Sequence, residues 1–199
     1  IKVKDQYEEN PFPRWSSLSL PARGSIGGTL ETLFPHYQVP ATIYDGCSIL
    51  IAGCGTGQHP IQWALRYPDC HLTAIDLSLK SLAFAMRRSQ DYGVSNLRFL
   101  QADILKLEDC EQQFDVISCS GVLHHMADPM AGWRTLVTKL SPGGVMKVAV
   151  YSRRARHQIS TVRGWISEQG LTPTENNIRE IRQLIFCLLY TSPSPRDAT

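Results

Sequence analysis

The feature that most constrains the fold is an alternation of short apolar runs with amphipathic stretches, which begins at Ser48. Each run has four to seven residues, as expected of a strand buried on both faces of a sheet. The runs are residues 48–52, 72–75, 97–100, 114–119 and 145–151. Strands that alternate with helices predict an α/β fold, in which a mostly parallel sheet carries flanking helices joined by right-handed crossovers.

Helices are predicted between these strands from caps and apolar spacing. A proline in the first turn opens a helix over residues 60–67. Residues 79–86 carry apolar side chains at i, i+3, i+4 and i+7, which is typical of a helix that covers a sheet. An Asp-Pro pair is the expected start of a helix over residues 128–140, and Ser-Pro-Gly-Gly at 141–144 should end it. A capping box at residues 172–175 predicts one more helix.

Composition is that of an ordinary globular domain. Of the 199 residues, 43% are hydrophobic and 19% are charged, so a core can form. The net charge of +2 gives no general attraction to nucleic acid or to an anionic membrane. No apolar run approaches the roughly 20 residues of a membrane helix, and no secretory pattern is present. Six scattered cysteines without a CxxC pair favour reduced thiols, a cytoplasmic location and no metal site.

Both ends of the chain differ from its middle. Residues 1–40 hold five of the twelve prolines, and we expect an extended arm that either covers an active site or seals an edge of the core. Residues 187–197, CLLYTSPSPRD, resemble a translated transposase adapter from DNA library preparation. We therefore expect 187–199 to be a non-native tail and the main domain, over 41–186, to be incomplete at its C-terminus. The first residue, Ile1 rather than Met, suggests a fragment.

A glycine-rich turn, Gly53-Cys54-Gly55-Thr56-Gly57, follows the first predicted strand. Glycine permits positive φ and lets a ligand approach the backbone. The helix behind the turn presents unpaired N–H groups and the positive end of its dipole. Such a turn can also serve only to pack a helix on a strand, so by itself it is weak evidence of a ligand.

Two carboxylates end the next two predicted strands. Asp76 lies 19 residues past Gly57, where an acidic side chain can accept both hydroxyls of an adenosine ribose. Asp103 ends the third strand, where a polar group can meet the exocyclic amine of adenine. Open α/β sheets bind ligands at this edge. Gln58 occupies the place of the third glycine of a dinucleotide fingerprint, and no P-loop sequence is present, so the spacing excludes both.

With these motifs, the chain resembles the class I S-adenosylmethionine-dependent methyltransferases. The matching segments are ILIAGCGTGQ (49–58), AIDLS (74–78), QADIL (101–105), FDVISCSGVLHHMADP (114–129) and LSPGGVMKVAVYS (140–152). The resemblance implies a Rossmann-like sheet that lacks the family's last strands. More narrowly, YEENPFPRW (7–15) before this core is similar to bacterial domains often found downstream of tetratricopeptide repeats, which implies that such repeats precede the natural sequence here.

The resemblance also implies S-adenosylmethionine as cofactor and a role for each matching position. The glycine turn would line the methionine part, the acid after the second strand would hold the ribose, and the next positions would flank the adenine and the sulfonium. In that order the predicted cofactor residues are Gly53, Cys54, Gly55, Thr56, Gly57, Asp76, Leu77, Asp103, Ile104, Ser120 and Gly121.

One position departs from the family's pattern. Many members carry an acid two residues before the first glycine, where it helps to orient the cofactor's amino group, and this chain has Ile51. His59 could substitute for that acid, although a solvent-facing histidine in the first turn of a helix is the ordinary interpretation.

A sulfonium methyl group is already activated, so the protein mainly aligns the acceptor and removes its proton when needed. His124 and His125 follow the fourth strand, and an imidazole with a pKa of about 6.5 suits a general base. We predict His125 as the candidate base. The alternative is that one histidine packs at a helix start and the other is exposed. The Asn/Asp-Pro-Pro-Tyr/Phe motif of DNA amino-methyltransferases is missing from SGVLHH, so nucleic acid is not supported as acceptor.

The sequence thus predicts methyl transfer from S-adenosylmethionine to an unidentified acceptor, a small molecule or a protein. The alternative is a non-catalytic cofactor-binding or scaffold domain attached to repeat modules, which Ile51 favours. A nicotinamide oxidoreductase is a third hypothesis, and the glycine spacing opposes it.

Overall fold

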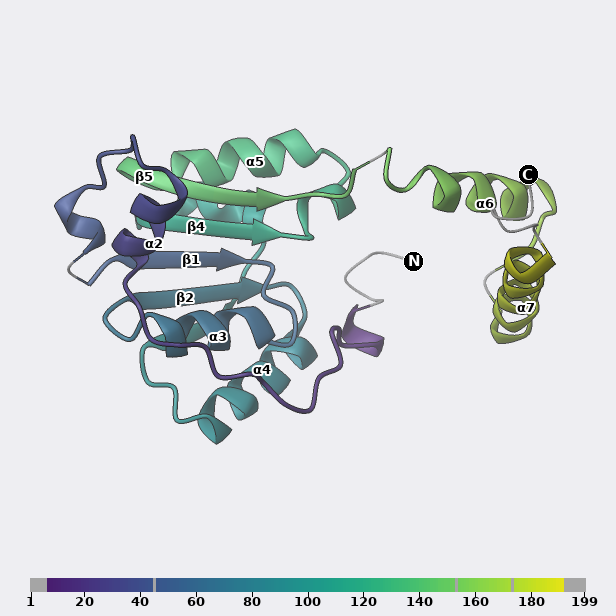
Figure 1. Ribbon diagram of the computed structural model, residues 1–199, viewed down its shortest axis with the longest axis horizontal. Coiled ribbons are helices and arrows are strands. Elements are labelled where there is room, and N and C mark those ends of the chain that lie inside the picture. The colour runs from purple at the N-terminus through teal and green to yellow at the C-terminus, as the bar shows by residue number, and fades with distance from the viewer. Residues whose placement is uncertain (1–6, 45, 153, 173, 192–199) are drawn as a thin grey trace, which may run out of the picture. The chain divides into compact units, whose positions relative to one another are not determined.

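The computed structural model describes residues 7–44, 46–152, 154–172 and 174–191 (Figure 1). The chain divides after Val150 into two compact units, residues 1–150 and residues 151–199, and each is described by itself. The bounds that we expect for the main domain, residues 41–186, stay a prediction.

Unit 1 is built on a five-stranded sheet with the order β3-β2-β1-β4-β5, and every neighbouring pair of strands is parallel. The labelled arrows in Figure 1 accordingly point the same way. The strands are β1 (Ser48–Ala52), β2 (His71–Asp76), β3 (Leu97–Gln101), β4 (Phe114–Ser120) and β5 (Leu140–Ala149). The predicted α/β class with a parallel sheet is confirmed.

Helices cover both faces of this sheet, because alternate residues of each strand point to opposite faces. On one face Ile49 and Ile51 of β1 belong to the same core as Ala64 and Leu82 of the helices α3 and α4. On the other face the core includes Leu136 of α5. The helices are α3 (Gln58–Arg66), α4 (Leu79–Asp91) and α5 (Pro129–Thr138), with short 3₁₀ turns η1 (Ala41–Ile43), η2 (Ile104–Asp109) and η3 (Leu123–His125).

The predicted start of α5 is confirmed in atomic detail. Asp128 Oδ1 accepts from the N–H groups of Met130 and Ala131, at 2.9 and 3.1 Å, and Pro129 occupies the first turn. We predicted that Ser141-Pro-Gly-Gly144 would separate the helix from the next strand. The segment lies inside β5 instead, so β5 begins earlier than predicted. The register of β4 with β5 shifts between Phe114 and Val116, so β5 accommodates this segment as an irregularity.

The arm also differs from an extended chain. Residues Ile26–Leu33 form α2, whose N-cap Ser25 accepts from the Gly28 N–H at 2.9 Å. Two glycines in eight residues weaken the apolar periodicity, and so the helix was not expected from the pattern.

Unit 2 contains α6 (His157–Glu168) and α7 (Glu175–Thr191). Thr174 Oγ1 accepts from the Asn177 N–H at 3.3 Å, so the cap of α7 lies two residues later than the predicted capping box. The predicted tail, residues 187–199, lies partly in the end of α7 and partly outside the described residues. Within the described ranges, none of the helices is long and apolar enough to cross a bilayer.

Candidate functional site

The candidate site lies at the carboxyl ends of β1, β2 and β4. The strand order reverses its direction between β2-β1 and β4-β5, which makes this edge the topological switch point where open α/β sheets bind ligands. All eleven predicted cofactor residues lie in segments that end or follow strands at this edge. Their assignment to the cofactor stays a prediction, and their geometry is as follows.

The glycine turn after β1 adopts a backbone that needs glycine. Gly53, Gly55 and Gly57 have φ of +76°, +53° and +84°, all in the left-handed region. A Cβ on Gly53 would stand 2.2 Å from a methyl carbon of Val122, and one on Gly57 would stand 2.5 Å from Ala85 Cβ. The first and last glycines therefore let the turn pack closely on its neighbours, which is the packing role that we left open.

Asp76 links β2 to this turn. Its Oδ2 accepts from the Gly55 N–H at 2.7 Å, and its Oδ1 accepts from the Ser78 N–H at 3.0 Å. A carboxylate has about four acceptor positions, so two N–H partners leave it able to accept from ligand hydroxyls as well. The side chain that we predict to hold a ribose is thus fixed in orientation by the turn that we predict to hold the methionine part.

The residues predicted to surround the adenine lie at the ends of β2 and β3. Leu77 is 41% exposed, so its side chain presents an apolar surface at this edge. Asp103 caps η2, with Oδ1 accepting from the Leu105 N–H at 3.0 Å, and Ile104 behind it is buried. Within the described residues the other oxygen of Asp103, Oδ2, makes no hydrogen bond, so it is available to accept from an amine.

Buried hydroxyls without partners distinguish the end of β4. Ser118 Oγ and Ser120 Oγ are shielded from solvent and have no hydrogen-bond partner among the described residues. A buried hydroxyl without a partner costs free energy, and such groups often mark places where a ligand or ordered water supplies the bond. Ser120, which we predicted as a cofactor residue, ends β4 at the edge of the sheet, whereas Ser118 lies two residues inside the strand and was not predicted. Gly121 follows with φ +77°.

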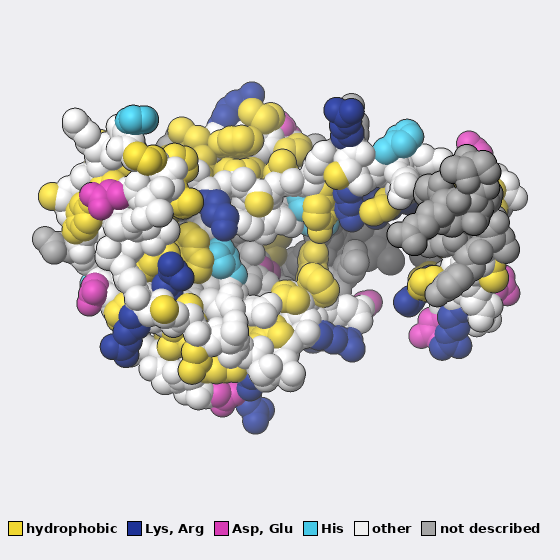
Figure 2. Space-filling model, in the orientation of Figure 1, with side chains coloured by type: hydrophobic (Ala, Val, Ile, Leu, Met, Phe, Trp, Pro, Cys, Tyr) yellow, Lys and Arg dark blue, Asp and Glu magenta, His cyan; other side chains and the backbone are white. Residues whose placement is uncertain are grey.

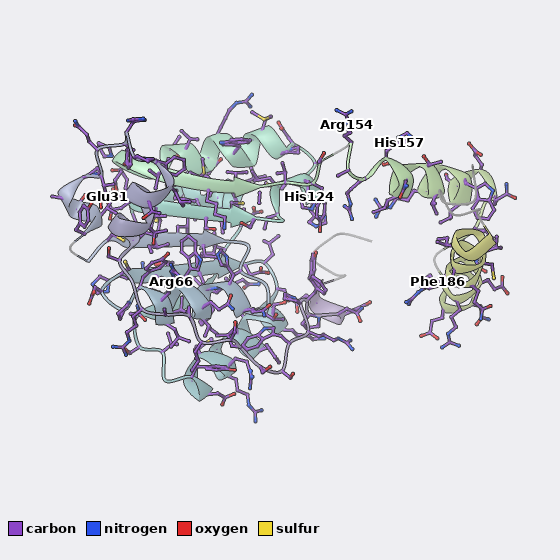
Figure 3. The ribbon with its side chains drawn as sticks, viewed as in Figure 1. Glu31, Arg66, His124, Arg154, His157 and Phe186 are labelled. Atoms are coloured by element: carbon purple, nitrogen blue, oxygen red, sulfur yellow. The ribbon has the colours of Figure 1, made fainter. Side chains whose placement is uncertain are left out.

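The two histidines lie in η3, directly after β4. Their ring centroids are 4.1 Å apart, and His124 lies at the carboxyl end of the strand, as labelled in Figure 3. His124 is half-buried and His125 is exposed. The ring of Tyr7 stands edge-on to His125, with centroids 6.2 Å apart and an interplanar angle of 76°. The candidate base therefore lies beside the arm as well as beside the predicted cofactor site.

His59 does not face solvent, contrary to the ordinary interpretation of its position. Its ring packs edge-on against Trp63, with centroids 4.9 Å apart. Burial, with a smaller contribution from the positive charge of Lys147, lowers the pKa of His59 to about 4. The imidazole is therefore neutral at pH 7. Ile51, which stands where the resemblance led us to expect an acid, is fully buried and gives His59 no charged partner.

Cys54 and Thr56 occupy the positions between the glycines. Burial, helped by the charge of Asp76, raises the pKa of the Cys54 thiol well above its usual range, so the group is a neutral thiol. Thr56 is buried and its hydroxyl donates to the Pro13 carbonyl at 2.6 Å. The indole Nε1 of Trp15 donates to both the carbonyl and the hydroxyl oxygen of Thr56, at 3.2 Å each. Thr56 thus holds the arm, which its place in the turn did not indicate.

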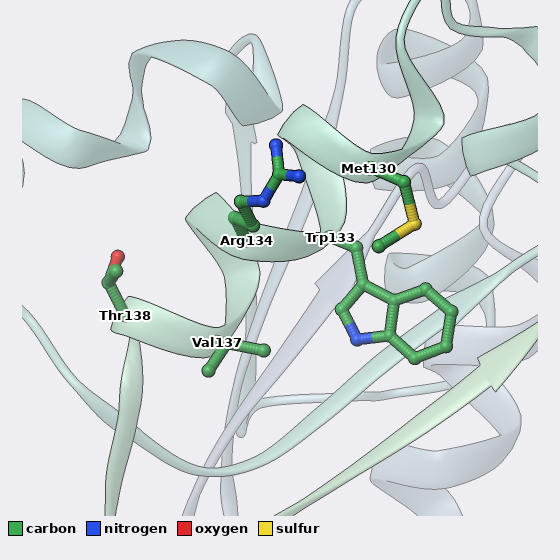
Figure 4. Close-up of a pocket in the computed structure, with 5 residues that line it drawn as sticks. All are labelled: Met130, Trp133, Arg134, Val137 and Thr138. Atoms are coloured by element: carbon green, nitrogen blue, oxygen red, sulfur yellow. The ribbon is translucent and has the colours of Figure 1, made fainter.

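An apolar groove of about 470 Å³ lies elsewhere, on the outer side of α5. Figure 2 shows hydrophobic side chains gathered over this helix, and Figure 4 shows the groove residues themselves. They are Met130, Trp133, Arg134, Val137 and Thr138. All five come from one helix, so the groove has no opposite wall and no convergent polar groups of the kind that orient a cofactor.

Comparison with known proteins places this chain in a family. Residues 43–182 match the family model of the methyltransferase domain, so the chain belongs to that family. It is 31% identical over 165 residues to phosphoethanolamine N-methyltransferase 1 of Triticum aestivum, covering 83% of this chain and 32% of that protein. It is 41% identical over 112 residues to an uncharacterized protein of Synechococcus, covering 56% of this chain and 27% of the other.

Solved structures agree on the fold. PKMT2 from Rickettsia typhi, in complex with AdoHcy, superposes with a TM-score of 0.69 at 19% identity, covering 88% of this chain and 35% of that one. The chain spans only 27% to 33% of the length of the first three curated relatives that it matches. Family membership confirms S-adenosylmethionine as the cofactor. The residues present fit it, because a positive-φ glycine turn, an oriented carboxylate and the Ser120 hydroxyl, which has no partner among the described residues, lie at one edge of the sheet.

Proposed function

We propose that this chain transfers the methyl group of S-adenosylmethionine to a small molecule or a protein side chain. The observation that carries the proposal is the contact between Asp76 Oδ2 and the Gly55 N–H at 2.7 Å. This contact holds the Asp76 carboxylate next to Gly55, which has no Cβ to obstruct a ligand. The carboxylate can still accept further hydrogen bonds. That combination suits a ligand with a hydroxylated ribose and an extended polar tail.

The cofactor supplies a methyl group on positively charged sulfur. In the proposed reaction the carbon–sulfur bond breaks as the acceptor nitrogen or oxygen forms its bond to that carbon, and S-adenosylhomocysteine leaves. The acceptor loses a proton, and His125 is the proposed group that takes it when the acceptor is a poor nucleophile. The other residues of the site would align the acceptor with the methyl group and exclude water.

The choice of acceptor class rests on the relatives. One is by name a phosphoethanolamine N-methyltransferase, and another, from Bacillus anthracis, is a malonyl-[acyl-carrier protein] O-methyltransferase. They match this chain over 165 and 132 residues, which are 32% and 46% of their own lengths. We therefore propose only the classes that they represent, small molecules and proteins that carry a nucleophilic nitrogen or oxygen. Repeats upstream of residue 1 are a further proposal, which rests on the similarity of residues 7–15 to repeat-linked domains.

The test is transfer of radiolabelled methyl groups. The full chain is incubated with labelled S-adenosylmethionine and, separately, with a filtrate of small metabolites and a protein fraction, and both label and S-adenosylhomocysteine are measured. We expect one fraction to be labelled, with the label lost in Asp76→Ala. Asp69→Ala is the matched control, because Asp69 is exposed and precedes the same strand that Asp76 ends. Tight cofactor binding without label in either fraction would support the non-catalytic alternative instead.

A further inference from the structure

The arm lies along the candidate site and contacts it at several points. Beyond the bonds of Thr56 with Pro13 and Trp15, the Phe12 carbonyl stands 2.6 Å from the place where a Cβ on Gly55 would be. Trp15 also packs under the guanidinium of Arg88 of α4, whose carbon lies 4.8 Å from the ring centroid. The arm therefore closes over the central glycine of the turn.

Glu8 fastens the arm to the first turn of α4. Its Oε1 accepts from the Leu79 N–H at 2.7 Å, and its Oε2 lies 3.4 Å from the Lys80 nitrogen. First-turn N–H groups have no partner within their own helix, and the helix dipole favours a negative charge there. The side chain of a distant residue thus supplies a charged cap to the helix that begins three residues after Asp76.

Tyr7 contacts residues that follow β2 and residues that follow β4. Its carbonyl accepts from Ser78 Oγ at 3.2 Å, on the β2 side, while its ring stands against His125, on the β4 side. β1 lies between β2 and β4 in the sheet. A segment that touches both neighbours of β1 at the same edge lies across the end of β1, where the glycine turn begins.

We propose that residues 7–15 form a closing segment over the cofactor site and that Glu8 is the positioning residue that holds it shut. The inference rests on the proposed function, because it assumes that the cofactor binds under the segment. A ligand enclosed in this way leaves only after the segment detaches. The contact of Glu8 with α4 therefore controls how fast cofactor and product exchange, without touching either.

The experiment measures the dissociation rate of S-adenosylhomocysteine from the full chain by stopped-flow displacement. Glu8→Gln keeps the shape of the side chain and removes its charge. A charge-assisted bond is worth about 1.5 kcal/mol, so we expect dissociation about tenfold faster. Glu9→Gln is the matched control, because Glu9 is exposed and makes no hydrogen bond among the described residues. S-adenosylhomocysteine should dissociate from this variant at the wild-type rate.

Limited cleavage by trypsin after Arg14, which is exposed, measures directly how often the closing segment is detached. We expect S-adenosylhomocysteine to slow cleavage in the wild type and in Glu9→Gln, and to protect Glu8→Gln less. The inference would be overturned if S-adenosylhomocysteine dissociated at the same rate from the wild type, Glu8→Gln and Glu9→Gln, or if the ligand did not change the rate of cleavage. Either result would show that the segment stays fixed in place when the ligand exchanges. A folded wild type that does not bind the ligand at all would instead contradict the proposed function.

Discussion

The polar groups at the two ends of the sheet differ in whether the protein itself supplies their hydrogen-bond partners. At the amino ends of the strands, polar side chains satisfy the backbone around them. Asn96 Nδ2 donates to the carbonyls of Cys70 and Tyr67, at 2.9 and 3.1 Å. Asp115 Oδ2 accepts from the Ser48 N–H at 2.8 Å. Each of these bonds joins segments that are distant in the sequence, and so this end is fastened together by the protein alone.

At the carboxyl ends the groups remain available or are held by the arm. Ser118 and Ser120 have hydroxyls without partners in the described part of the chain, and Asp76 keeps acceptor capacity beyond its two N–H partners. From this difference we expect one edge to serve stability and the other to bind a ligand. Substitutions at the amino end should therefore lower stability without changing cofactor binding, and those at the carboxyl end should do the reverse.

Among the variants that leave Asp76 in place, the largest effect on ligand affinity should come from Gly55→Ala, at the carboxyl end. The new Cβ would stand 2.6 Å from the Phe12 carbonyl, and the φ of +53° disfavours alanine. We expect S-adenosylhomocysteine affinity to fall by about 2 kcal/mol, roughly 30-fold, in calorimetry. Gly93→Ala is the control, since Gly93 has a similar φ of +65° and open space around it. If Gly55→Ala binds S-adenosylhomocysteine as tightly as the wild type does, the proposed difference between the two edges is contradicted.

Asn96→Ala should show the opposite behaviour at the amino end. It removes the donor to the Cys70 and Tyr67 carbonyls, of which the Tyr67 carbonyl keeps the Cys70 N–H at 3.2 Å, so the free energy of unfolding should fall by about 1–2 kcal/mol in urea titrations. The affinity for S-adenosylhomocysteine should be unchanged at temperatures where the variant is folded. A loss of affinity with an unchanged unfolding midpoint would contradict the separation of roles between the two edges.

His59 sharpens the comparison, because it is a stabilising group near the carboxyl end. Its pKa is lowered to about 4 in the folded state, against about 6.5 when unfolded. Between these values the unfolded state binds a proton that the folded state does not, so stability is lost as pH falls from about 6.5 to about 4. Between pH 7 and pH 5 the wild type should lose about 1–2 kcal/mol more than His59→Gln in urea titrations. Equal losses would show that His59 is not buried in this way.

The smallest effect should come from Ser120→Ala. Removing a hydroxyl without a partner should leave stability unchanged or raise it by up to about 1 kcal/mol, while ligand affinity falls about threefold. Ser118→Ala is the matched control, because it removes a similarly partnerless hydroxyl two residues further from the edge. It should raise stability without a change in affinity. Identical binding by the two variants would argue against a ligand role for Ser120.

Local chemistry made most of the sheet and the turn predictable. The first four strands, the cap at Asp128 and the glycine turn each follow from a few adjacent residues. The start of β5 was wrong, because Ser141-Pro-Gly-Gly144 normally ends an element but here lies in an irregular part of β5.

Contacts between distant residues were not predictable from pattern. Nothing in the sequence around Glu8 indicates that it caps α4, whose first residue lies 71 positions away. The same holds for Trp15 and Thr56, which are 41 residues apart. The sequence located the acids and glycines of the candidate site and left open whether the arm covers an active site or seals a core edge, and the structure shows which residues of the arm contact the glycine turn.

Calorimetry of S-adenosylhomocysteine with the wild type, Asp76→Ala and Asp69→Ala tests the central claim most directly. We expect micromolar binding by the wild type and by Asp69→Ala, and an affinity at least about 100-fold lower in Asp76→Ala, since that variant loses both the predicted ribose acceptor and the partner of the Gly55 N–H. Cooperative unfolding of each protein shows that it is folded. Equal binding by Asp76→Ala, or no binding by a folded wild type, would contradict the assignment of the carboxyl edge as the cofactor site.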